Sequence, residues 1–405
     1  MVYSKVMMKS VFRLVLIITF VFAGAWLVNN RYLLQSLKNY SSSEEPTDPA
    51  LTKLVRPSKP AEGELAKLQL PPGFSIAYFA KNVPGARSLA IGGEGKVIYV
   101  GTRDKTVYAV TDSDQNGESE SVVKIVTNLN TPNGVAIKDG DLYVAEISRI
   151  LRYQNIDQTY TSNPQPEVVF DTLPKDTHHG WKYLAFGPDG LLYIPIGAPC
   201  NNCVDTGRYA RLNRLNIETK QMETYATGIR NTVGFDWNPR DNSLWFTDNG
   251  RDSLGDDIPK DELNHAPSNG LFFGFPYCHG FSVVDPQLGK PDSCNTHTRP
   301  AIELGPHVAA LGMKFYRGDM FPREYKNKVI LAEHGSWNRT TPIGYRLSTI
   351  DIAGGSASNY VPLVEGWLDG KDSWGRPVDV AELPDGSLLI SDDQAGAVYR
   401  LTYNP

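Results

Sequence analysis

A short unit that recurs six times after residue 70 is the feature that most constrains the fold of this chain. Each copy reads small-apolar-x-apolar, then a turn such as Asp-Gly, then an apolar stretch that contains Tyr or Trp in most copies. Two alternating strands around a Gly/Asp/Asn turn are typical of a β-hairpin. The copies begin at Ser88, Gly134, Tyr183, Gly234, Leu311 and Asp379.

Most hairpins are followed by another short strand pattern, as in TVYAVTD, RILRYQN, RLNRLNI and AVYRLTY. Six copies at roughly 45–75-residue spacing, each supplying one four-stranded antiparallel sheet, predict an all-β, six-bladed β-propeller. The widest spacings predict insertions after the fourth hairpin, from Arg251 to about Pro300, and around the fifth. Loops on one face of a propeller meet near its axis, where a rigid scaffold holds them.

Composition agrees with many short strands joined by turns. The 405 residues include 36 Gly and 28 Pro, and no long helical periodicity follows the N-terminal region. The formal net charge of −5 comes without a basic block, so the chain lacks the charge pattern of a nucleic-acid-binding protein.

The N-terminal region predicts export. Basic residues precede an apolar run over 14–28, and residues 23–25 have the small-x-small form of a cleavage site. Residues 1–35 are therefore a signal peptide or an uncleaved membrane anchor. Both alternatives place the remaining chain in the periplasm or outside the cell. Residues 36–70 read as a flexible, Pro-containing linker, and 71–405 as the propeller.

The four cysteines fit an oxidising compartment. Their order along the chain favours the pairs Cys200–Cys203 and Cys278–Cys294, although four cysteines allow three pairings. A redox motif or half a zinc site at Cys200 and Cys203 is the less favoured alternative, because the motif lies in a Pro/Asn-rich loop and no second CxxC follows.

Histidines and arginines recur next to the hairpins, where a propeller turns its loops toward the axis. A single loop His or Arg is usually a solvated or structural group. Repeated placement at equivalent points predicts one cationic site with a proton acceptor, suited to a polyanionic ligand. The groups are His178-His179-Gly180, Arg230-Asn231, His307, the 333–339 segment with His334, and Trp374-Gly375-Arg376.

Six stretches resemble the PQQ-dependent sugar dehydrogenases (PQQ is pyrroloquinoline quinone), the soluble aldose and glucose dehydrogenase group, and most closely their sorbosone-dehydrogenase-like branch. The resemblance runs from about Leu70 to the C-terminus. The stretches are HHGWKYLAFGPDGLLYIPIGAPCN, TGIRNTVGFDWNP, FTDNGRDSLGDDIPKDELN, FFGFPYCHG, ILAEHGSWNRTTPIGYRL and GRPVDVAELPDGSLLISDD.

The resemblance implies roles for five residues. His179 matches the catalytic base, which takes the proton of the substrate hydroxyl while hydride passes to the quinone. His178 stands where relatives have a supporting acid. Arg230 and Asn231 match the pair that polarises the reactive quinone carbonyl. The backbone carbonyls of Gly250 and Arg251 match the ligands of a calcium ion that bridges to PQQ.

The resemblance also implies cofactor contacts. Arg376 fits one of the arginines that bind PQQ carboxylates, and Val378 replaces its second partner. Arg339 takes the place of a cofactor-binding lysine across a gap in the alignment. His334 is assigned to cofactor binding with Arg339. Trp337 or Trp374 stacks on the cofactor or on a sugar; a wall-forming Trp is the equal alternative.

A second calcium site is the less favoured interpretation of residues 112–117, Asp-Ser-Asp-Gln-Asn-Gly. The segment begins like an acidic calcium loop, but Val123 stands where an EF-hand places its bidentate Glu. A solvated turn between strands is the preferred interpretation.

Together these features predict PQQ- and calcium-dependent oxidation of a sugar or sugar aldehyde. Electrons would pass to an extracytoplasmic quinone or cytochrome. One alternative is a calcium-dependent lactonase on the same fold, which would need acidic and amide side chains from several blades around a metal. The other is a non-catalytic propeller that binds a partner or glycan.

Overall fold

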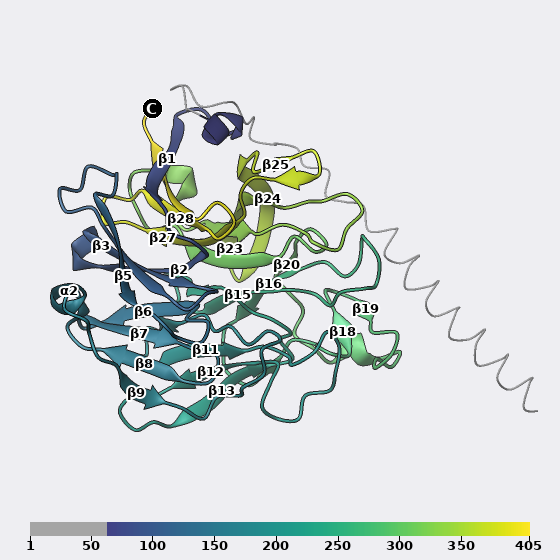
Figure 1. The fold of residues 1–405 in the computed structure, drawn as a ribbon. Helices are drawn as coiled ribbons and strands as arrows, with labels where there is room; N and C mark the ends of the chain where they lie inside the picture. The colour runs from purple at the N-terminus through teal and green to yellow at the C-terminus, as the bar shows by residue number, and fades with distance from the viewer. Residues whose placement is uncertain (1–62) are drawn as a thin grey trace, which may run out of the picture.

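The computed structural model describes residues 63–405, and these form six small sheets around a common axis (Figure 1). The predicted six-bladed propeller is confirmed, and each predicted hairpin supplies the first two strands of a blade. Blade 1 contains β2 (Ala86–Gly92), β3 (Val97–Thr102), β4 (Val107–Thr111) and β5 (Ser121–Val126). Blade 2 contains β6 (Gly134–Lys138), β7 (Asp141–Ala145), β8 (Ile150–Tyr153) and β9 (Glu167–Phe170).

The third and fourth blades include parts of the predicted insertion. Blade 3 contains β10 (Ala185–Phe186), β11 (Leu192–Ile196), β12 (Arg211–Leu215), β13 (Met222–Thr227) and β17 (Leu271–Phe272). Blade 4 contains β14 (Phe235–Trp237), β15 (Leu244–Asp248), β16 (Glu262–Ala266) and β20 (Ile302–Glu303). The β17 strand joins β13 in parallel, so blade 3 has a fifth strand beyond the expected antiparallel four.

The last two blades bring the ends of the domain together. Blade 5 contains β21 (Ala310–Phe315), β22 (Val329–Glu333), β23 (Arg346–Ala353) and β24 (Ser356–Glu365). Blade 6 contains β27 (Pro377–Glu382), β28 (Leu388–Asp392), β29 (Ala397–Tyr403) and β1 (Phe74–Lys81). The β1 strand comes from the start of the domain and pairs antiparallel with the final strand. This pairing closes the ring of blades with backbone hydrogen bonds.

Short elements connect the blades. They are η1 (Gly63–Lys67), η2 (Gly93–Gly95), α2 (Ile156–Thr159), η3 (Ser293–Asn295), η4 (Arg323–Tyr325), β18 (Cys278–His279), β19 (Val283–Val284), β25 (Leu368–Asp369) and β26 (Asp372–Ser373). The β18–β19 hairpin lies in the insertion between β16 and β20, and the Cys278–Cys294 disulfide ties it to η3. The Cys200–Cys203 disulfide is also present, so both expected pairings are confirmed.

The core lies between the blades. Each of six large apolar clusters joins two neighbouring sheets, and one cluster occupies each gap around the ring. Strands buried on both faces explain why sequences such as VIYVGT read as continuous apolar runs. The stacked blades therefore form a rigid ring, and its loops can hold side chains in fixed positions at the axis.

Residues 63–70, which the sequence assigns to the linker, pack against the propeller. Leu65, Leu68 and Leu70 are buried in the cluster between blades 5 and 6. The predicted signal or anchor segment lies outside the described residues. Within residues 63–405, no helix has the length and apolar character needed to cross a membrane.

Candidate active site

A cavity of about 360 Å³ opens on the propeller axis, where the loops of five blades meet. The loops that enter the first strand of a blade, or leave its second, supply most of the lining. The lining residues are Arg87, Arg103, His179, Trp181, Arg230, Asn231, Val233, Asn249, Gly250, Asp252, Asp261, His307, Ala309, Leu311, His334, Trp337 and Arg376.

Bulges in the innermost strands help to aim side chains at this cavity. The strands β2, β21 and β27 each shift register at their first residues. A bulge turns a side chain that regular alternation would direct elsewhere. Arg87 and Leu311 lie within two of these shifts and line the cavity, and Val378 lies within the third.

His179 lies in the cavity wall on the loop before β10. Its Nδ1 lies 2.9 Å from the carbonyl oxygen of Ala198. A proton on Nδ1 donates to that carbonyl and leaves Nε2 unprotonated, as a general base requires. Its backbone has φ of 47°, and Gly197 admits it, because a Cβ at Gly197 would lie 2.6 Å from the Cβ of His179.

Burial is the largest influence on the charge of His179. Burial, the positive charge of Arg230 and the neighbouring His178 hold the pKa of His179 well below its usual range. The imidazole is therefore neutral at physiological pH. His178 is exposed, with its ring centroid 4.1 Å from that of His179. A backbone carbonyl thus orients His179 in this chain, where the resemblance implies a preceding acid.

Arg230 is held by four side-chain hydrogen bonds. It donates from Nε to the Asn201 carbonyl (3.0 Å) and from Nη1 to the Asn249 carbonyl (3.1 Å). Its Nη2 donates to Asn201 Oδ1 (2.9 Å) and to Asp252 Oδ2 (2.8 Å). Four of the five guanidinium N–H groups are used, so one remains for a ligand.

The backbone beneath Arg230 is fixed by a buried carboxylate. Asp248 accepts hydrogen bonds from the backbone N–H of Arg230 (2.8 Å) and from that of Asn231 (2.6 Å). Asn231 lines the cavity, and its side-chain amide makes no hydrogen bond within residues 63–405. The carboxylate therefore positions two cavity residues while leaving the amide of one available.

The next loop presents backbone oxygens. The N–H of Gly250 donates to Asp261 Oδ1 (2.8 Å), whereas the carbonyls of Gly250 and Arg251 accept no hydrogen bond from the described part of the chain. The side chain of Arg251 is buried in an ion pair with Asp285. Gly250 lines the cavity, and the guanidinium of Arg251 lies outside the lining.

Three buried carboxyl groups lie behind this loop. Burial raises the pKa of Asp248 to about 7, that of Asp261 to about 6 and that of Glu262 to about 8. Asp248 and Glu262 are direct cross-strand partners, and the charge of Asp248 further raises the pKa of Glu262, while the charge of Asp261 further raises the pKa of Asp248. The residues just before β14 and just after β15 form this side of the site. We call them, Arg230, Asn231, Gly250 and Arg251, the blade 4 wall.

The opposite side of the cavity is rich in unpaired donors. Arg87 donates from Nε to Asn133 Oδ1 (2.5 Å) and from Nη1 to Asp393 Oδ2 (2.7 Å). The other carboxylate oxygen of Asp393 lies 2.8 Å from Nε2 of His334. Asp393 thus has both oxygens engaged, and Arg87 keeps three free N–H groups.

Two further arginines complete this side. The guanidinium of Arg376 donates only to the backbone carbonyls of His334 (2.9 Å) and Gly335 (2.7 Å). Arg103 makes no hydrogen bond within the described residues, and its guanidinium lies 3.8 Å from the ring centroid of Trp181. We call Arg87 and Arg376 the blade 6–1 wall; Arg103 lies at its more exposed outer edge.

An apolar patch lies between these walls. Val233, Leu311 and Val378 form a buried cluster, and the first two line the cavity. Val378, which the resemblance places opposite a cofactor-binding arginine of the glucose enzymes, packs beneath these two lining residues. The patch offers a planar ligand an apolar contact surface.

The remaining sequence candidates differ in position. Trp337 lines the cavity and is 73% exposed. Trp374 packs beside Trp367 and donates to the carbonyl of Gly366, outside the lining. Arg339 also lies outside the lining. Its guanidinium binds the backbone carbonyl of Asp256, so the structure does not bring it together with Arg376.

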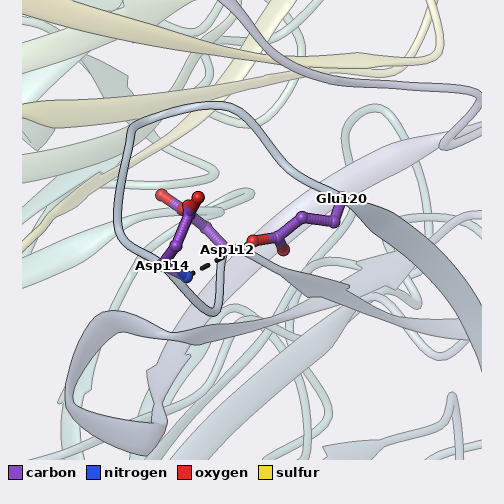
Figure 2. Close-up of side chains that lie close together, drawn as sticks. All are labelled: Asp112, Asp114 and Glu120. Carbon is purple, nitrogen blue, oxygen red and sulfur yellow. Dashed lines mark hydrogen bonds between the residues drawn. The ribbon is translucent and has the colours of Figure 1, made fainter.

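The acidic loop over 112–117 contributes no residue to the lining of the axial cavity, and Figure 2 shows its carboxylates Asp112 and Asp114 close to Glu120. Oxygens of Asp112, Asp114 and Glu120 lie within 4.8 Å of one another. Asp112 accepts from the backbone N–H groups of Asn116 and Gly117, both at 3.0 Å. Glu120 accepts from N–H groups at the start of the loop. The carboxylates hold the turn itself together, as the solvated-turn interpretation expects.

Sequence reasoning missed five charged or aromatic lining residues: Arg87, Arg103, Trp181, Asp252 and Asp261. A signal for the first existed, because Arg87 directly precedes the first repeat, as Arg230 precedes the fourth. Arg103 directly follows the first hairpin, as Asn249, which also lines the cavity, directly follows the fourth. Residues at equivalent points after each hairpin are therefore candidate site residues, as are those before it.

Comparison with known sequences shows one matching family and several similar proteins. A family model described as TrAA12-like matches residues 68–404. An uncharacterized protein of Borreliella burgdorferi is 35% identical over 358 residues, which cover 85% of this chain and 93% of that protein. A pyrroloquinoline quinone-dependent pyranose dehydrogenase of Coprinopsis cinerea is 27% identical over 224 residues, 42% of this chain and 30% of that protein.

Solved structures share the fold. The holo form of the PQQ domain of pyranose dehydrogenase from Coprinopsis cinerea has a TM-score of 0.72 and 17% identity, covering 86% of this chain and 98% of that domain. A calcium structure of a family AA12 enzyme from Trichoderma reesei has a TM-score of 0.72 and 18% identity, covering 89% of this chain and all of that one (100%).

Proposed function

The chain belongs to the TrAA12-like family of PQQ-dependent sugar dehydrogenases, and we propose that it oxidises a sugar or sugar aldehyde with PQQ and calcium. One observation supports this most strongly. A neutral imidazole, His179, shares an axial cavity with three guanidinium groups, those of Arg87, Arg230 and Arg376. The cavity thus combines a proton acceptor with a binding site for a polyanion.

The residues present fit PQQ, a planar molecule with three carboxylates. The blade 6–1 wall supplies free guanidinium donors, since Arg87 and Arg376 each use only two N–H groups. The apolar patch of Val233 and Leu311 suits its ring faces. The cavity volume falls within the range of about 300–1,000 Å³ that is usual for small-molecule sites.

The same fit extends to calcium. The carbonyl oxygens of Gly250 and Arg251 are hard ligands of the kind that calcium prefers, and no hydrogen bond within the described residues occupies them. Asp261 holds the N–H of Gly250 and so steadies this loop. We assign these two carbonyls to calcium, and Arg376, Arg87, His334 and Asn231 to cofactor binding. We assign Trp337 to the rim.

His179 acts as the general base. Its Nε2 accepts the proton of the reacting hydroxyl, while the Nδ1–H stays on the Ala198 carbonyl and keeps the ring in place. The remaining N–H of Arg230 stabilises negative charge on an oxygen bound beside it. The chemistry that PQQ supplies when bound is hydride acceptance, with calcium as a Lewis acid.

The physiological acceptor and compartment belong to the same proposal. Electrons leave for an extracytoplasmic quinone or cytochrome, and the chain works in the periplasm or outside the cell, cleaved or anchored through residues 1–35. The two disulfides and the apolar N-terminal run support this assignment.

Dye reduction tests the proposal. The purified protein, loaded with PQQ and calcium, is offered a panel of aldoses and sugar aldehydes, and reduction of an artificial acceptor is followed by absorbance. We expect substrate-dependent reduction that requires PQQ. Lactone hydrolysis in the absence of PQQ, together with no reduction by any sugar, would contradict the proposal and favour the lactonase alternative.

A further inference from the structure

Arg103 occupies a place that the proposed function leaves unused. It follows β3 and lines the axial cavity together with an outer groove of about 430 Å³, which also borders His334 and Arg376. Its side chain is 45% exposed, whereas that of Arg87 is 1% exposed. Arg103 therefore stands at the rim, where a molecule arriving from solvent meets the cavity.

Stacking fixes Arg103 without using its hydrogen-bond donors. Its guanidinium lies 3.8 Å from the ring centroid of Trp181. The nearest carboxylate, Asp393, is 3.9 Å away, and its oxygens are already engaged by Arg87 at 2.7 Å and His334 at 2.8 Å. A guanidinium held by its face keeps its edge N–H groups free, in the fork geometry that binds a carboxylate through two hydrogen bonds.

The local charge also favours an anion at this place. Burial, with the positive charges of Arg87 and Arg376, lowers the pKa of Arg103 to about 10. The carboxylate of Asp393 offsets only part of this repulsion. A ligand carboxylate beside Arg103 would supply the missing negative charge.

The stacking partner links Arg103 to the base. Trp181 follows His179 by two residues in the same loop, and both line the cavity. We therefore expect a sugar whose reacting hydroxyl meets Nε2 of His179 to have Trp181 and Arg103 within the same cavity. Exposure and position favour Arg103 for the substrate, because Arg87 and Arg376 are less exposed and the proposed function gives them to the cofactor.

We propose that Arg103, stacked on Trp181, forms a carboxylate subsite for the substrate, so that the preferred substrate is an acidic sugar such as a hexuronic acid. This inference rests on the proposed function. The anomeric carbon loses a hydride to the cofactor, and its hydroxyl loses a proton to His179. The substrate is oxidised by two electrons to the lactone, and its carboxylate remains intact as the group that Arg103 binds.

Matched sugars test the subsite. Glucuronate is compared with glucose, and galacturonate with galactose, in the PQQ- and calcium-loaded protein and in the Arg103→Gln variant. We expect kcat/KM at least tenfold higher for each acid in the parent. We expect Arg103→Gln to remove this preference through KM, without changing kcat/KM for the neutral sugars or the Kd of PQQ. Lys105→Gln, an exposed change of equal charge outside the lining, is the control.

Two results would overturn the inference. The first is equal kcat/KM for acidic and neutral sugars in the parent. The second is a tenfold or greater rise in the PQQ Kd of Arg103→Gln, which would assign this arginine to a cofactor carboxylate. If no sugar is oxidised, calorimetry decides instead. Binding of glucuronate but not glucose to the parent, lost in Arg103→Gln, supports the subsite; equal binding in parent and variant overturns it.

Discussion

The two walls of the axial cavity leave opposite kinds of polar group unpaired. On the blade 4 wall, Arg230 uses four of its N–H groups, and the unused acceptors are the carbonyls of Gly250 and Arg251. On the blade 6–1 wall, Arg87 and Arg376 each use only two of their five guanidinium N–H groups within the described residues. The blade 4 wall can therefore bind a cation, and the blade 6–1 wall can bind anions.

Different supports explain this contrast. Behind the blade 4 wall, Asp248 and Asp261 are buried and accept hydrogen bonds from backbone N–H groups. Behind the blade 6–1 wall, the carboxylate of Asp393 lies within 4 Å of the side-chain nitrogens of Arg87, Arg103 and His334. The first arrangement sets the backbone in place before any ligand arrives. The second leaves like charges close together, so a ligand with several carboxylates lowers the energy of the site.

The largest expected effect concerns the base that faces both walls. His179→Ala should lower kcat by about 10²- to 10⁴-fold, the usual contribution of general base catalysis. The PQQ Kd should change less than threefold, since neither wall is altered. Dye-reduction kinetics and a PQQ titration measure the two quantities. His178→Ala is the control, and parental activity in His179→Ala would refute the assigned base.

Removing one arginine from each wall should lower the free energy of unfolding by different amounts. Arg230→Ala leaves Asp252 without its buried partner, so we expect a loss of about 3 kcal/mol in the free energy of unfolding together with weaker PQQ binding and lower kcat. Arg376→Ala should weaken PQQ binding with a smaller loss of stability, because its bonds are to carbonyls alone. Urea unfolding measures the stability of both variants, and PQQ titration measures their cofactor binding. Equal losses of stability in the two variants would contradict the proposed difference between the walls.

The buried carboxyls make a pH prediction for the blade 4 side. Burial, and then the charge of Asp248, raise the pKa of Glu262 from 4.5 to about 8. The folded state therefore binds more protons than the unfolded state between these values, and this contribution to stability is lost as pH rises toward 8.

Glu262→Gln should remove that loss. The amide keeps an acceptor for the N–H of Gly280 but cannot ionise. We expect its unfolding free energy to fall less than that of the parent between about pH 5 and pH 8. Denaturant unfolding at several pH values measures this difference, with the exposed Glu64→Gln as control. A parallel decline in Glu262→Gln would contradict the raised pKa.

The smallest effect is expected at the rim. Trp337 is 73% exposed, so Trp337→Ala should leave the unfolding free energy within about 0.5 kcal/mol of the parent. The KM for the sugar should rise by a few fold, because this ring borders the cavity that receives the substrate. Steady-state kinetics and urea unfolding provide the two readouts, and Phe281→Ala, at an exposed apolar position outside the lining, is the control.

The repeat predicted the blades because each hairpin carries its own alternation and turn. Closure by β1 was not predicted, since this strand lies before the first hairpin and pairs with the opposite end of the domain. The two-residue β17 is too short to leave a pattern. Position in the repeat likewise pointed to Arg230, whereas the place of Arg339 depends on a loop conformation that directs it to Asp256.

Arg103 shows a different limit of sequence reasoning. It stands in the polar segment Arg-Asp-Lys after β3, which reads as an ordinary turn. Its partner Trp181 comes from blade 3. These two loops meet only when the blades close into a ring, so no local sequence pattern predicts the contact between Arg103 and Trp181.

A titration of the purified protein with PQQ, followed by absorbance with and without calcium, tests the division between the two walls most directly. Saturable binding at micromolar PQQ that strengthens with calcium is the predicted result, because one wall receives the anion and the other the cation. Absence of binding at micromolar PQQ in the presence of calcium would contradict the account.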